Sequence, residues 1–95
     1  MAVCIVMECP GMNAEQYEAL MNVVELRGIN PAWPRGLINH VVGFTSDGAY
    51  VVNVWQSQHL FDGFVENRLR PAFQVVGGLT EPRFITFDVY KSYVA

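Results

Sequence analysis

The chain alternates four strand-like runs with two stretches of helical spacing, and this order restricts the folds that it can adopt. The strand-like runs are rich in β-branched and aromatic residues and lie at 3–7, 37–45, 50–56 and 84–90. Apolar residues recur at helical spacing in the two longer intervals between them. The order strand, helix, strand, strand, helix, strand predicts an α+β, ferredoxin-like βαββαβ fold with a four-stranded antiparallel sheet. With 95 residues, the chain 1–95 is expected to form one domain.

The first helix has signals at both of its ends. Asn13 is followed three residues later by Gln16, which predicts a capping box. One apolar side then follows at positions i, i+3, i+4 and i+7, formed by Tyr17, Leu20, Met21 and Val24. Gly28 predicts the C-terminal stop of this helix, and the prolines of residues 29–36 predict a loop after it.

Turn-forming residues mark the limits of the other elements. Cys9, Pro10 and Gly11 predict the end of the first strand, because Pro and Gly interrupt regular structure. Asp47-Gly48 lies between two strand-like runs and predicts a hairpin. Ser57 predicts the cap of the second helix. Pro71 and Gly77-Gly78 predict an irregular tail for that helix.

Apolar residues occupy both alternating sides of the strands. Two helices cover only one face of a four-stranded sheet, so the other face should be polar. Here the second set is apolar too, as in the pairs Cys4 and Val6, Val52 and Val54, and Ile85 and Phe87. A face of this kind exceeds the apolar patch that monomers usually expose. We therefore expect a homodimer in which two sheets pack face to face, a dimeric α+β barrel; a monomer with a wetter face is the alternative.

Composition excludes several classes of function. The formal net charge of −3 and the scattered arginines argue against nucleic-acid binding. The chain has no apolar run long enough to span a membrane and no basic leader, so we expect a cytoplasmic protein. Two cysteines do not make a disulfide framework, and Cys4 is expected in the core. With His40 and His59 they offer no recognisable metal spacing, so no metal site is expected.

Short motifs in the second half of the chain resemble a known family. They are Gly36–Gly43, Asp47-Gly48, Val54–Ser57, Phe61–Phe64 and Arg68–Pro71. Together they resemble small dimeric α+β barrel proteins of the antibiotic biosynthesis monooxygenase-like superfamily. Members with known activity oxidise polycyclic phenols to quinones with O₂ and without metal or flavin; others degrade haem, and some have no known reaction. The resemblance implies a homodimer that binds a small aromatic molecule and needs no cofactor.

The chain departs from the active members of that family at two places. The quinone-forming members carry an Asn and a Trp four residues apart on the third strand, whereas Asn53 and Trp55 are two apart. Both still share one face of a strand, at a separation of ~6.6 Å. Haem degraders need an Asn on the first strand and a His well after the Trp. Here the first strand offers Met7, and His59 follows Trp55 by four residues, so haem degradation is disfavoured.

Three polar or aromatic residues on the central strands are the candidate catalytic residues. His40 lies among valines, and its pKa suits a general base that deprotonates a phenol. Its structural alternative is a buried histidine bonded to a backbone carbonyl or to Asp88. Asn53 is a candidate anchor for a substrate oxygen or a bond to the neighbouring strand. Trp55 is a stacking wall or a core residue. The hairpin register decides whether His40 and Asn53 share a face.

Four further residues are candidates for substrate binding. Tyr17, Phe61 and Phe64 lie on the inner sides of the helices, where they either line a pocket or fill the core. Arg68 either meets an anionic substrate group or is a solvated charge near a helix C-terminus. The sequence thus predicts a cofactor-independent monooxygenase-like enzyme acting on an aromatic polyketide-type phenol. A non-catalytic ligand-binding or structural dimer module, and a non-oxidative cyclase or isomerase, are the alternatives.

Overall fold

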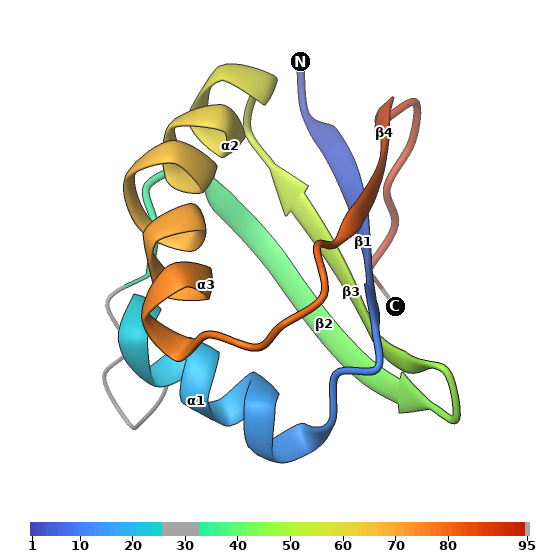
Figure 1. The fold of residues 1–95 in the computed structure, drawn as a ribbon. Helices are drawn as coiled ribbons and strands as arrows, with labels where there is room; N and C mark the ends of the chain where they lie inside the picture. Colours follow the sequence, from blue (N-terminus) through green and yellow to red (C-terminus); the bar gives the residue numbers. More distant parts are fainter. Residues whose placement is uncertain (26–32, 95) are drawn as a thin grey trace.

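One antiparallel sheet forms the first layer of the structure and three helical segments form the second (Figure 1). The computed structural model describes residues 1–25 and 33–94. The strands are β1 (Val3–Pro10), β2 (Leu37–Thr45), β3 (Gly48–Trp55) and β4 (Arg83–Asp88), in the order β2-β3-β1-β4. The helices are α1 (Ala14–Val24), α2 (Gln58–Phe64) and α3 (Arg70–Val76). The predicted ferredoxin-like fold is confirmed.

Helix α1 begins as its sequence predicts. The Asn13 backbone N–H donates to the Gln16 side chain at 2.9 Å, and the Gln16 N–H donates to the Asn13 side chain at 2.8 Å. This reciprocal pair is the predicted capping box. The helix ends at Val24, and Glu25 adopts the left-handed conformation with φ 63°. The predicted stop at Gly28 lies outside the described residues.

The second helical region changes its pitch before Pro71. Ser57 caps α2 as predicted and accepts a bond from the Leu60 N–H at 3.2 Å. A π-helical turn, Val65–Leu69, then separates α2 from α3. A proline inside a regular helix clashes with the carbonyl four residues before it, and the wider turn relieves this conflict. The predicted irregularity is therefore one π turn, and α3 continues to Gly77, whose φ is 70°.

Three of the four strands differ in their limits from the sequence prediction, and β3 runs over Gly48–Trp55 rather than 50–56. β1 does not stop before Cys9 but runs on to Pro10, because Cys9 pairs with Ala49 and Pro10 with Gly48. Pro10 is the last residue of the strand, a position where a missing N–H is tolerated. β4 ends at Asp88 rather than at Tyr90. The predicted hairpin at Asp47-Gly48 joins β2 to β3.

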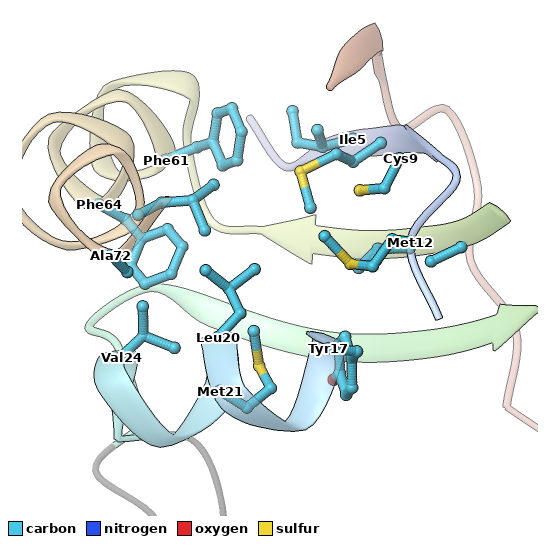
Figure 2. Close-up of a cluster of buried hydrophobic side chains, with 14 of the residues drawn as sticks. Ile5, Cys9, Met12, Tyr17, Leu20, Met21, Val24, Phe61, Phe64 and Ala72 are labelled. Atoms are coloured by element: carbon cyan, nitrogen blue, oxygen red, sulfur yellow. The ribbon is translucent and has the colours of Figure 1, made fainter. Parts of the chain in front are cut away.

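The hydrophobic core fills the space between the sheet and the helices (Figure 2). The helix-facing side of β1 contributes Val3, Ile5, Met7 and Cys9, all buried. Burial raises the pKa of the Cys9 thiol to about 11. Cys4 is buried as expected but points to the opposite face of the sheet. Within residues 1–25 and 33–94, no helix has the length and hydropathy of a membrane span.

The opposite face of the sheet carries apolar side chains in two adjacent cross-strand rows. The first row crosses all four strands as Val41, Val52, Val6 and Ile85. The second row is Asn39, Val54, Cys4 and Phe87. A third row is polar and contains the ion pair of Arg83 with Glu8 at 3.2 Å. Val41, Ile85 and Phe87 are each more than half exposed, so no helix of the described chain covers this apolar face.

The hairpin turn generates the first testable prediction. Gly48 has φ +140°, and a Cβ atom there would overlap the Cys9 carbonyl oxygen and lie 2.6 Å from the Gly11 backbone nitrogen. Gly48→Ala should therefore lower the free energy of unfolding by about 2 kcal/mol or more, measured by urea unfolding. Gly43→Ala is the control, because its Cβ meets nothing within 4 Å, and it should change stability by less than about 0.5 kcal/mol. Equal stability of the two variants would contradict the account of this turn.

Candidate active site

The register of the β2–β3 hairpin places His40 directly opposite Asn53. Both side chains lie on the helix-facing side of the sheet, and His40 Nδ1 is 2.7 Å from Asn53 Oδ1. Asn53 is the one buried polar side chain of the described residues, with 7% of its surface exposed. Its amide oxygen thus has a partner, as a buried polar atom requires.

Tyr17 of α1 completes a hydrogen-bonded chain of three side chains. Its hydroxyl oxygen lies 2.6 Å from His40 Nε2, and the two rings lie end to end across this bond, with their planes 19° and their centroids 6.2 Å apart. Phe44 packs edge-on against the Tyr17 ring, with the ring centroids 6.1 Å apart. The partners of His40 are therefore two side chains. Asp88 lies on β4, at the opposite edge of the sheet, so it is not the partner.

The acceptor at one end of this chain sets the direction of its hydrogen bonds. An amide oxygen only accepts, so His40 Nδ1 carries the proton and donates to Asn53. Neutral His40 then has its lone pair on Nε2, which accepts from the Tyr17 hydroxyl. Burial, with a smaller contribution from the negative charge of Glu18, raises the pKa of Tyr17 to about 12. Tyr17 therefore stays protonated at neutral pH.

Trp55 places an unpaired donor among the core aromatics. Its side chain is 1% exposed and packs against Phe61 and Phe64, with ring centroids at 5.6 and 5.2 Å. The indole Nε1–H is buried and finds no acceptor among the described residues. An unsatisfied buried donor costs about 1–3 kcal/mol. It marks a place where the oxygen of a water or ligand would bind.

These polar groups surround a small apolar cavity. Its volume is about 20 Å³, enough for about one water molecule. The lining includes Tyr17, His40, Asn53, Trp55, Phe61, Phe64 and Leu69, together with Met7, Met12 and Met21. The methionines were not among the predicted site residues, since their positions indicate only core packing. Their flexible side chains fill space that a ligand would need.

A larger groove of about 260 Å³ lies beside the cavity, between α3 and β4. Leu69, on the π turn, lines both spaces. Phe84 lines the groove and packs against Phe61, which lines the cavity, with the ring centroids 5.9 Å apart. Leu69 therefore borders both the groove and the cavity.

Arg68 does not line this cavity. Its guanidinium donates to the Val24 carbonyl at the end of α1 and lies 5.7 Å from the centre of the Phe64 ring. Arg68 therefore connects the π turn to α1. The parts of the chain that the structure describes contain no cluster of three or more His, Cys, Asp or Glu residues that could bind a metal ion.

Comparison with known proteins places this site in a known fold. No family model and no curated protein matches the chain. Solved structures do match: SnoaB, a cofactor-independent oxygenase from Streptomyces nogalater, is 13% identical with a TM-score of 0.64, over 96% of this chain and 94% of that one. The ActVA-Orf6 monooxygenase of Streptomyces coelicolor, in complex with nanaomycin D, is 19% identical with a TM-score of 0.55, over 99% and 91%.

The chain shares the fold of these two oxygenases. The heme degrader MhuD of Mycobacterium tuberculosis, with two hemes in its active site, shares it at 17% identity and a TM-score of 0.55, over 99% of this chain and 100% of that chain. The resemblance seen in the sequence is confirmed at the level of the fold. Identities this low carry the architecture and not the reaction.

The environment of Tyr17 generates a prediction about alkaline pH. The tyrosinate absorbance of the wild type minus that of Tyr17→Phe should titrate with a midpoint near 12 rather than near the usual 10.0. Because the pKa is raised in the folded state, the unfolded chain loses this proton first. The contribution of Tyr17 to the free energy of unfolding is then fully present below about pH 10 and is lost as the pH rises through about 12. A difference titration centred near 10 would contradict the buried position of the hydroxyl.

Proposed function

We propose that this chain is a cofactor-independent monooxygenase-like enzyme that oxidises an aromatic, polyketide-type phenol with O₂. The observation that supports this most is the chain of hydrogen bonds from Tyr17 through His40 to Asn53 inside an otherwise apolar cavity. A half-buried base that two hydrogen bonds orient suits abstraction of a phenolic proton.

The proposed reaction begins when the phenol loses its proton, with His40 as the base that becomes protonated. The electron-rich phenolate then reduces O₂ by one electron, and the two radicals combine at the ring carbon para to the oxygen. Cleavage of the O–O bond leaves one oxygen atom on the ring as a quinone carbonyl. The other oxygen leaves as water with the phenolic hydrogen and the hydrogen of the attacked carbon. Phenol and O₂ thus give quinone and water without an external reductant.

Asn53 and Trp55 support this chemistry in different ways. Asn53 accepts from His40 Nδ1, so it orients the imidazole and stabilises the cation that forms there. Its oxygen thus serves His40, whereas its NH2 group supplies the donors that a substrate oxygen would accept. The free Nε1–H of Trp55 is a donor for the oxygen that gains negative charge.

The ligand needs more room than the closed cavity offers. Pockets for small molecules typically enclose about 300–1,000 Å³. We propose that Leu69 moves aside, so that the ring system lies partly in the groove between α3 and β4 and partly in the cavity. Phe61 and Phe64 then line its path, as the sequence analysis expected.

The proposed base generates a prediction for turnover. His40→Ala should reduce oxygen uptake with anthrone-type or naphthol-type phenols by about 10²–10⁴-fold, since the proton loses its acceptor. Uptake by the metal-free protein is measured with an oxygen electrode, and thermal unfolding shows that the variant folds. His59→Ala is the matched control, because His59 is exposed on α2, and it should keep wild-type uptake.

The same assay separates the alternatives. Uptake that survives in His40→Ala contradicts the assignment of the base. Conversion of a phenol by the wild type under argon would instead identify a cyclase or isomerase that uses the same base. Binding without any conversion would identify a ligand-binding module.

We also propose that the chain, as one domain per subunit, acts as a homodimer. The apolar rows around Val52 and Val6 leave a sheet face without cover, and a second copy of the same face would bury it. The polar row with Arg83 and Glu8 would border such an interface.

This proposal generates a prediction about assembly. Val52→Arg should convert a dimer to a monomer in sedimentation velocity, because it places a charge in the middle of the apolar rows. Val52 points away from its own core, so the monomer should stay folded. Val75→Arg is the control, since Val75 is 71% exposed on α3, away from the sheet, and it should leave the dimer intact. A wild-type monomer would contradict the proposal.

A further inference from the structure

We infer that Tyr17 is a catalytic residue that takes the substrate's proton on its hydroxyl oxygen while passing its own proton to His40. This inference rests on the proposed function and adds the route by which the proton reaches the base. It follows from which atoms of the three side chains are already engaged.

Neither nitrogen of His40 is free for a substrate. Nδ1 donates to Asn53 at 2.7 Å, and Nε2 accepts from Tyr17 at 2.6 Å. A phenol that gave its proton directly to His40 would first have to displace the Tyr17 hydroxyl from a short hydrogen bond. The edge contact of the Tyr17 ring with Phe44 and the burial of Tyr17 hold that hydroxyl in place.

The oxygen of Tyr17 is the atom that still has accepting capacity. A hydroxyl that donates one hydrogen bond keeps its lone pairs for a donor. Tyr17, Asn53 and Trp55 all line the cavity into which the substrate would have to reach. A substrate hydroxyl placed there can donate to Tyr17 without breaking any existing bond of the cluster.

The proton transfer is balanced over the three groups. The substrate O–H bond breaks and a new O–H bond forms on Tyr17, while the original Tyr17 O–H bond breaks and an N–H bond forms on His40 Nε2. The substrate becomes an anion, His40 becomes a cation, and Tyr17 is neutral before and after. Burial keeps the pKa of Tyr17 near 12, so the tyrosine is suited to relay a proton and not to hold a negative charge.

The direction of the relay is tested by the protonation state of His40 in the resting protein. In ¹⁵N-labelled protein, at a pH where the imidazole carries one proton, NMR should find that proton on Nδ1 of His40 and none on Nε2; His59→Ala assigns the two histidines. Tyr17→Phe should keep the proton on Nδ1 but shift the Nε2 resonance, because its donor is gone. A proton on Nε2 in the wild type would overturn the inference, since Nε2 could then receive nothing from Tyr17.

Kinetics test the relay itself. With a phenol that the wild type oxidises, Tyr17→Phe should lower kcat by about 10²-fold and change KM by less than about threefold. Tyr90→Phe, at an exposed site, is the control and should match the wild type. The double variant Tyr17→Phe/His40→Ala should be no slower than His40→Ala, because both residues serve one transfer.

The outcomes distinguish the proton relay through Tyr17 from the proposed oxidation of a phenol. Wild-type activity in Tyr17→Phe, or losses that multiply in the double variant, would overturn the relay and leave His40 as base. A wild type that oxidises no phenol would contradict the proposed function, whatever the position of the His40 proton.

Discussion

The register of the β2–β3 hairpin fixes the two faces of the sheet and, with them, the candidate site. It sets His40 opposite Asn53 and turns both toward the helices, where Tyr17 reaches them. A slip by one residue would turn every side chain of β2 to the other face. His40 would then leave the core, and Val41 would enter it. Gly48 fits closely against the β1 backbone and so helps to fix this register. The position of the candidate site and of the apolar outer face both follow from it.

The sequence predicts the parts of this protein that follow from local rules. The order of the elements, the cap at Asn13 and the hairpin at Asp47-Gly48 each depend on neighbouring residues, and each was found as predicted. The contacts of His40, in contrast, join residues that lie far apart in the sequence. A bulge between Leu37 and Asn39 interrupts the alternation of β2, and Tyr17 comes from an element 23 residues away. No local pattern fixes such contacts, and the bond from Arg68 on the π turn to the Val24 carbonyl likewise joins distant parts of the chain.

The candidate site combines polar groups with a closed apolar shell. Because half-buried His40 hydrogen-bonds to buried Asn53, the amide oxygen lies beside the core without the cost of an unpaired polar atom. Trp55 is the exception, and its free donor points to an oxygen that the resting protein itself does not supply. Methionines and Leu69 close the cavity with side chains that can change rotamer. The structure thus suits a ligand that enters by rearranging side chains rather than by filling a preformed pocket.

The central claim is that an aromatic ligand binds between the sheet and the helices, beside the tyrosine–histidine–asparagine chain. The most direct test is the indole N–H resonance of Trp55 in NMR spectra during titration with 1-naphthol, with exposed Trp33 as the internal reference. If the ligand binds there, the Trp55 resonance should shift and show contacts to the naphthol ring protons, while the Trp33 resonance stays unchanged. Binding that leaves Trp55 unaffected, with contacts confined to Val41 and Ile85 on the outer face, would contradict it.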